Sequence, residues 1–144
     1  MRLSVFSPTS STQLFIDLKK LYAGYLDEKQ LTPEALQTLI TPNVERPELL
    51  FFVTLFNARH LGAVQVSINQ QTATLSLLAV RDITRRRGVG KNLLREVEKK
   101  LIEKGMNEIQ LSLASVQEDE QQGIIYFMEA CGYQLNNQRL IKNV

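Results

Sequence analysis

A run of three arginines followed by two closely spaced glycines, Arg85 to Gly90, has residue types suited to binding an anion. The start of a helix leaves backbone N–H groups without partners and carries partial positive charge. Glycines at such a start let phosphate oxygens approach the backbone, and arginines add charge-assisted hydrogen bonds. The pattern therefore predicts a phosphate-binding turn between a strand ending at Val80 and a helix beginning at about Val89.

The spacing in this turn excludes two common nucleotide motifs. No Gly-Lys-Ser/Thr follows, as a P-loop requires, and the pattern is not Gly-x-Gly-x-x-Gly. A nucleic-acid patch is an alternative, because residues 85–104 hold eight Lys or Arg against three Glu. Basic charge is unfavourable at a helix N-terminus unless an anion offsets it, and no aromatic residues alternate with the basic ones. We therefore expect no nucleic-acid partner.

Length and composition predict one domain over residues 1–144, because 44% of the 144 residues are hydrophobic and the net charge is only +2. The single cysteine, Cys131, excludes an internal disulfide and fits a reducing cytoplasm. With one histidine, His60, the chain cannot form a zinc site of the common type. No apolar run approaches the ~18 residues of a membrane span. We expect a cytoplasmic protein with no metal and no membrane partner.

Hydrophobic periodicity predicts the elements that must position the turn. We expect strands at 2–6, 49–56, 61–68, 73–80 and 108–114, with two closing strands after Gly132, and helices at 10–25, from Pro33 to Pro42, at 89–104 and at 119–131. A four-residue turn, 57–60, joins the second and third strands. Antiparallel strands come first and a crossover helix follows the strand at 73–80. This order predicts an α/β (α+β) fold with a mixed sheet and helices on both faces.

The turn and the strand before it together resemble the coenzyme A loop of the GCN5-related N-acetyltransferase (GNAT) superfamily, whose signature is Gln/Arg-x-x-Gly-x-Gly/Ala. The resemblance implies the GNAT fold, a mostly antiparallel twisted central sheet with helices on both faces, and acetyl-CoA or CoA as the cofactor. It implies that the pyrophosphate is held by Arg85, Arg86, Arg87, Gly88, Val89, Gly90 and Lys91, and that the pantetheine arm pairs with Leu78, Ala79 and Val80.

The same resemblance bears on catalysis. Many members use a tyrosine four residues before a Gly-aromatic pair as general acid, and here Gly132-Tyr133 places Met128 there. Tyr126 lies about 200° from Met128 around a helix, so we expect it to point elsewhere. The strands at 61–68 and 73–80 contain no Asp or Glu to act as base. We therefore assign no catalytic residue and interpret Met128 as core packing. Water could replace both groups, so an N-acetyltransferase acting on a small amine or a protein amine stays an alternative.

Four segments, at 16–25, 56–66, 80–90 and 126–133, resemble the PanZ (PanM) group of this superfamily more specifically. That resemblance implies a protein that binds acetyl-CoA or CoA and then binds the aspartate 1-decarboxylase proenzyme. It would promote self-cleavage of the proenzyme to the pyruvoyl form, in pantothenate biosynthesis, with CoA-dependent feedback. It also implies that the turn bearing Asn57 and Arg59 contacts the decarboxylase.

The residues of that turn have other readings. Asparagine in a turn is usually there because it suits the backbone conformation, and we favour this interpretation of Asn57 over a partner contact. We interpret His60 as a surface turn residue and Cys131 as a small core residue at a helix end. The segment 26–47 departs from the group in being longer and more regularly helical.

Overall fold

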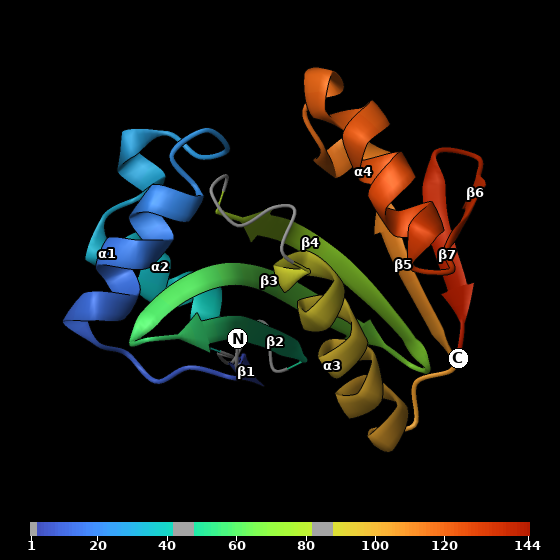
Figure 1. The fold of residues 1–144 in the computed structure, drawn as a ribbon, viewed down its shortest axis with the longest axis horizontal. Helices are drawn as coiled ribbons and strands as arrows, with labels where there is room; N and C mark the ends of the chain where they lie inside the picture. The colour runs from blue at the N-terminus through green and yellow to red at the C-terminus, as the bar shows by residue number, and fades with distance from the viewer. Residues whose placement is uncertain (1–2, 42–47, 82–87) are drawn as a thin grey trace.

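The computed structural model describes residues 3–41, 48–81 and 88–144, which form a seven-stranded sheet flanked by helices (Figure 1). Most element boundaries lie within a few residues of the predicted ones. The predicted helix at 10–25 already ends at Leu21, and the strand predicted at 108–114 ends at Ser112. The elements in chain order are β1 (Ser4–Phe6), α1 (Thr12–Leu21), the 3₁₀ turn η1 (Glu28–Gln30), α2 (Pro33–Ile40), β2 (Leu49–Phe56), β3 (Arg59–Asn69), β4 (Thr72–Val80), α3 (Val89–Glu103), β5 (Glu108–Ser112), the 3₁₀ turn η3 (Leu113–Ser115), α4 (Glu118–Ala130), β6 (Gln134–Asn136) and β7 (Arg139–Asn143).

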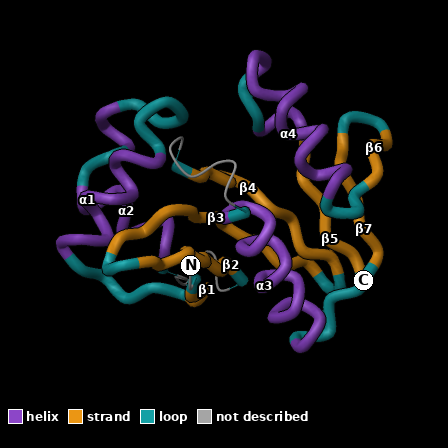
Figure 2. The backbone as a smooth tube through the Cα atoms, in the orientation of Figure 1, coloured by secondary structure: helices purple, strands orange, loops and turns teal. Residues whose placement is uncertain are grey.

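The strands lie in the order β1-β2-β3-β4-β5-β7-β6 and form one twisted layer (Figure 2). Among the described strands only β4 and β5 run parallel, whereas the other neighbours are antiparallel. Parallel neighbours need a crossover connection, and α3 supplies it between β4 and β5. The predicted mixed, mostly antiparallel sheet is confirmed.

Helices cover both faces of the sheet, as predicted. Side chains alternate between faces along a strand, and β3 shows the alternation clearly. Ala63 packs in a buried cluster with Leu14 and Leu18 of α1, while its neighbour Val64 packs in a second cluster with Leu93 of α3. The second cluster also contains Met128 of α4, so α3 and α4 share one core.

The hairpin between β2 and β3 is tighter than predicted. Its loop is only Asn57 and Ala58, with φ of 49° and 61°, and β3 already begins at Arg59. A two-residue loop of this kind needs positive φ at both positions, and its twist matches that of the flanking strands. Asn57 therefore has the backbone role expected of it. Arg59 and His60 belong to a strand, so the four-residue turn at 57–60 is wrong.

The predicted start of α2 is confirmed in detail. Thr32 is the N-cap, and its side-chain oxygen accepts a hydrogen bond from the Ala35 amide at 3.2 Å. Pro33 occupies the first helical position, where its missing N–H costs nothing. Between the end of α1 and the start of α2, the only regular element is the short 3₁₀ turn η1.

Candidate functional site

The sheet opens between its two parallel strands. β4 pairs with β5 only from Thr72 to Leu75, opposite Glu108 to Leu111, yet β4 continues to Val80. Within the described sheet, residues 76–80 are held by β3 alone, so the edge of β4 that faces β5 has no strand partner there. An unpaired strand edge can accept an extended ligand through backbone hydrogen bonds.

A bulge in β4 lies at the start of this opening. Ser76 pairs with Gln65 and Ala79 with Ala63, so β4 has one extra residue relative to β3 in this stretch. Leu77 takes a left-handed φ of 51°, which bends the strand and increases its twist. The hydroxyl of the fully buried Tyr22, the C-cap residue of α1, donates to the Leu77 carbonyl oxygen at 2.6 Å. Burial raises the pKa of Tyr22 far above its ordinary value, so the hydroxyl stays a donor.

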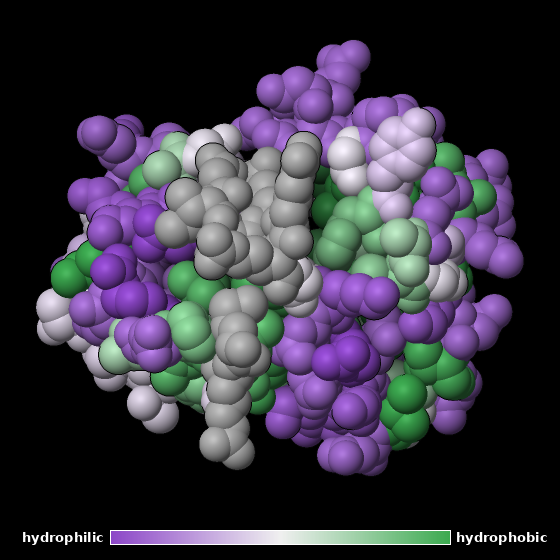
Figure 3. All heavy atoms as spheres, in the orientation of Figure 1, coloured by the Kyte–Doolittle hydropathy of each residue, from purple (hydrophilic) through white to green (hydrophobic). Residues whose placement is uncertain are grey.

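A cavity of about 320 Å³ lies in the opening. An apolar patch lies over α4 beside a hollow in the surface (Figure 3). The lining comes from the connection between α1 and η1, from β4 and β5, from the start of α3, from the connection between β5 and α4, and from one face of α4. The lining residues are Tyr25, Leu77, Leu78, Val80, Gly90, Leu111, Ser115, Val116, Gln117, Glu120, Gly123, Ile124 and Phe127.

The N-terminus of α3 borders this cavity. Gly88 is the N-cap with φ of 77°, and among the described residues no side chain caps the helix. The first amides of α3 are therefore available to an anion, and the helix dipole favours one there. Among the described residues, a Cβ at Gly88 would meet no atom within 4 Å, whereas a Cβ at Gly90 would lie 3.0 Å from Cζ of Phe127. Gly90 thus also permits close packing of α3 against α4.

The predicted binding residues are brought partly together. Leu78, Val80 and Gly90 line the cavity. Ala79 points to the opposite face, into the cluster with α1, and Val89, the first residue of α3, is fully buried. Lys91 is exposed at the start of α3, and Arg85, Arg86 and Arg87 lie outside the described residues.

Sequence reasoning missed the contribution of α4. Glu120, Gly123, Ile124 and Phe127 line the cavity at the i, i+3, i+4, i+7 spacing of one helical face. A glycine inside this stripe was the available signal, because glycine is unfavourable within a helix.

The predicted packing role of Met128 and the predicted orientation of Tyr126, both on α4, are confirmed. Met128 is fully buried in the core, while the side chain of Tyr126 is 69% exposed. Methionine is a packing residue here, and Tyr126 does not line the cavity.

Away from the cavity, a polar cluster around Asp17 joins the β2–β3 hairpin to α1. Asp17 is fully buried, and its carboxylate accepts hydrogen bonds from Nε2 of Gln13 at 2.8 Å, Nε of Arg59 at 3.1 Å and the His60 amide at 2.8 Å. Nδ1 of His60 lies 2.8 Å from the same carboxylate. Burial raises the pKa of Asp17, but the hydrogen bonds from His60, Gln13 and Arg59 outweigh it, so the pKa lies below its ordinary value.

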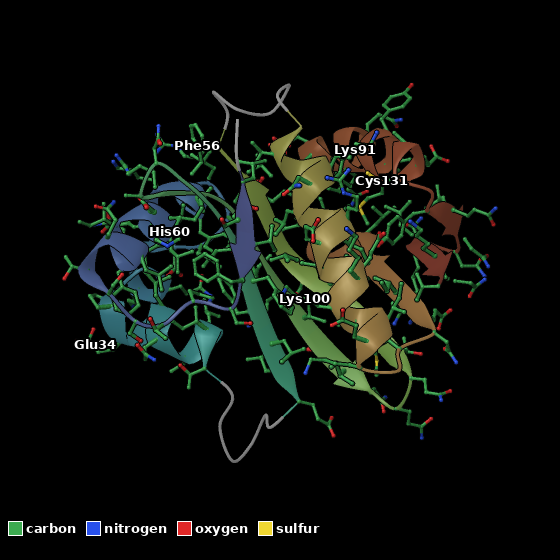
Figure 4. All side chains as sticks on the ribbon, turned by 60° about the horizontal axis from the view of Figure 1, so that its bottom comes forward. Glu34, Phe56, His60, Lys91, Lys100 and Cys131 are labelled. Atoms are coloured by element: carbon green, nitrogen blue, oxygen red, sulfur yellow. The ribbon has the colours of Figure 1, made fainter. Side chains whose placement is uncertain are left out.

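This cluster corrects the interpretation of His60. The residue is only 7% exposed and is held by Asp17, so it is not a surface turn residue. His60 and Cys131 lie on opposite sides of the molecule, which excludes a cysteine–histidine pair (Figure 4). Burial raises the pKa of the half-buried Cys131 thiol, which keeps it protonated.

The part of the chain that the structure describes contains no group of three or more His, Cys, Asp or Glu residues that could hold a metal ion. None of its helices combines the length and the apolar character needed to cross a membrane.

The fold and the opened sheet define the class of protein, that of the GNAT superfamily. The solution structure of the putative N-acetyl transferase YhhK from E. coli, bound to coenzyme A, matches over 100% of both chains, with 28% identity and a TM-score of 0.78. The N-acetyltransferase PaiA of Thermoplasma acidophilum, in complex with coenzyme A, shares the fold with a TM-score of 0.70 over 98% of this chain and 97% of its own, at 20% identity.

Within this class the chain belongs to the PanZ family. The family model described as acetyltransferase (GNAT) domain, PanZ, matches residues 3–141. The PanD regulatory factor of Salmonella typhimurium is 38% identical over 82 residues, and that of Escherichia coli is 37% identical over 87 residues. These matches cover 57% and 60% of this chain, and only 61% and 58% of the relatives' own lengths. The predicted membership is confirmed.

Proposed function

We propose that the cavity between β4 and β5 binds coenzyme A or acetyl-CoA, and that the loaded protein regulates the maturation of a PanD-type aspartate decarboxylase in the cytoplasm. The observation that carries the proposal is the unpaired edge of β4 beside the uncapped N-terminus of α3. One feature suits an extended amide-bearing arm and the other suits a diphosphate.

The residues present fit this cofactor. Leu78 and Val80 belong to the open part of β4, where backbone groups can pair with a pantetheine arm. The amides at the start of α3, after Gly88, suit the diphosphate, and Lys91 adds positive charge at the same end. Within the proposal, Arg85, Arg86 and Arg87 contact phosphate oxygens and Val89 contributes a backbone amide. Ala79 contributes through its backbone, since its side chain packs on the α1 side.

The regulatory role is supported by two relatives that bear the name PanD regulatory factor. It is also supported by Met128, whose thioether cannot donate the proton that a departing thiolate needs. A ligand that is bound without being consumed can act as a signal. Binding of the cofactor and of the partner would then strengthen each other by linkage.

The test mixes the protein with purified aspartate decarboxylase proenzyme and follows chain cleavage on gels, with and without CoA or acetyl-CoA. We expect cleavage to accelerate only when both the protein and the cofactor are present. Calorimetry measures binding of each cofactor alone. If both cofactors bind but cleavage is unchanged and no complex forms, the regulatory role is wrong although the cofactor site stands.

The hairpin tip gives a matched test of the partner surface. Asn57 is exposed, whereas Arg59 is engaged by Asp17, so Asn57→Gly removes one side-chain amide without disturbing the cluster. Glycine also tolerates the positive φ at this position. We expect weaker binding of the proenzyme with unchanged affinity for CoA. Full retention of proenzyme binding would remove Asn57 from the partner surface.

A catalytic N-acetyltransferase is the second candidate, and one observation favours it. Glu120 is the one carboxylate among the described lining residues, so it could accept a proton from an amine. The release of CoA thiol across a panel of amines tests this role. Turnover well above hydrolysis in water, abolished in Glu120→Gln, would establish the enzyme instead of the regulator.

A further inference from the structure

Two connections that are distant in sequence meet on the α1 side of the cavity. Nε2 of Gln117, the N-cap residue of α4, donates to the carbonyl oxygen of Gly24 at 2.6 Å, although the two residues are 93 positions apart. Gly24 lies between α1 and η1, and its neighbour Tyr25 lines the cavity, as does Gln117 itself. The contact therefore joins the two sides of the opening.

Both halves of this contact are held in place. On one side the ring of Tyr25 meets the buried Tyr22 edge-on, with ring centroids 6.4 Å apart, and Tyr22 is itself bound to β4. On the other side Nε2 of Gln121 donates to the carbonyl oxygens of Leu113 at 2.9 Å and Val116 at 3.2 Å. These bonds fix the connection that carries Gln117. The closure is thus a supported wall, which we call the rear wall (Gly24, Tyr25 and Gln117).

The cavity has two unlike ends. At one end Gly90 and Phe127 meet beside the N-terminus of α3, where the proposed function puts the diphosphate. The rear wall stands on the α1 side. A thioester arm that starts at the phosphate end and follows β4 would direct its acyl group toward this wall. The whole cavity has a volume of about 320 Å³.

We infer that the rear wall sets the acyl length of the ligand, admitting CoA and short thioesters such as acetyl-CoA and rejecting medium-chain acyl-CoAs. The inference rests on the proposed function and names the ligand class of the same site. A longer chain would have to separate Gln117 from Gly24 and break the hydrogen bond between these two exposed residues. Removing the Gln117 side chain opens the wall and lets the chain pass.

The experiment measures dissociation constants by calorimetry for CoA, acetyl-CoA and hexanoyl-CoA with wild type, Gln117→Ala and Gln122→Ala. Gln122 is an exposed glutamine on α4 that does not line the cavity, so it serves as the matched control. For the wild type we expect hexanoyl-CoA to bind at least about tenfold more weakly than acetyl-CoA. In Gln117→Ala this difference should fall below about threefold, and Gln122→Ala should match the wild type.

The outcomes separate this inference from the proposed function. Hexanoyl-CoA binding to the wild type as tightly as CoA would overturn the inference and leave the CoA site intact. Unchanged discrimination in Gln117→Ala would overturn it as well. If CoA itself does not bind the wild type, the proposed function fails first. Gln117→Glu is the second variant, since a carboxylate facing the Gly24 carbonyl cannot donate and should relax the discrimination in the same way.

Discussion

The two edges of β4 differ, and the difference is the basis of the site. Toward β3 the strand is paired along its length, from Thr72 to Val80, interrupted only by the bulge. Toward β5 it is paired for less than half of that length. The same residues thus complete a core on one side and leave backbone groups free for a ligand on the other. The proposed binding site therefore depends on residues that have a strand partner on one edge and none on the other.

The largest expected effect is the loss of CoA affinity on substitution of Gly88. Gly88→Glu puts a carboxylate where the diphosphate is proposed to bind, so affinity for CoA should fall at least about a hundredfold, which is roughly 2.7 kcal/mol. Because Gly88 has a φ of 77°, Gly88→Asn is the control, since asparagine tolerates left-handed backbone without adding charge. Calorimetry on both folded variants decides the matter. Unchanged affinity in Gly88→Glu would place the cofactor elsewhere.

A smaller effect, on the free energy of unfolding, should distinguish Gly90, on the side of the opening, from Gly62, on the paired side in β3. Gly90→Ala sets a Cβ 3.0 Å from Phe127, and such crowding should cost about 1–3 kcal/mol in urea unfolding. Gly62→Ala, on the paired side in β3, meets its nearest atoms at an ordinary 3.4 Å and should cost less. Phe127→Leu should restore stability to Gly90→Ala. Equal costs at the two glycines would refute the close contact between α3 and α4.

Tyr22→Phe tests whether the bulge depends on α1. Losing the hydrogen bond to Leu77 should destabilise the protein by about 1 kcal/mol and weaken CoA binding several-fold, because the bulge opens the cleft. Tyr126→Phe, which changes an exposed ring on α4, is the matched control and should change neither quantity. If Tyr22→Phe lowers stability but leaves CoA affinity intact, the bulge is set by β4 itself.

The smallest effect expected is a pH dependence on the side away from the cleft. The pKa of Asp17 is lower in the folded protein than in the unfolded chain, so its stabilisation is complete above the unfolded pKa of about 3.9 and is lost as pH falls through the folded pKa. The free energy of unfolding of wild type minus that of Asp17→Asn should therefore shrink between about pH 5 and pH 2. A difference that is constant over this range would contradict the lowered pKa.

Local pattern was enough to predict much of the fold. Alternation located the strands, and Thr32-Pro33 gave the start of α2 because capping and proline act within one turn. The hairpin shows the limit. Residues 57–60 all suit a turn, but the two-residue loop of Asn57 and Ala58 satisfies the strand twist, which leaves Arg59 and His60 in β3.

The site was predictable only where a motif crosses it. Gly88 and Gly90 stand in a recognisable pattern, and Leu78 and Val80 precede it. The rear wall depends on a contact between Gly24 and Gln117, and no local signal connects residues so far apart in the chain. The left-handed Leu77 was equally hidden, because leucine has no preference for that conformation and its hydrogen bond to Tyr22 comes from a residue distant in the sequence.

The short pairing between β4 and β5 has a dynamic consequence. Only four residue pairs, from Thr72–Glu108 to Leu75–Leu111, join the two halves of the described sheet to each other. Amide protons along this seam should exchange with solvent sooner than those of the β3–β4 ladder, since opening it breaks few bonds. A ligand bound in the opening between β4 and β5 would add contacts between the two halves of the sheet. Its binding would be visible as slower exchange of the amide protons in the Thr72–Leu75 pairing.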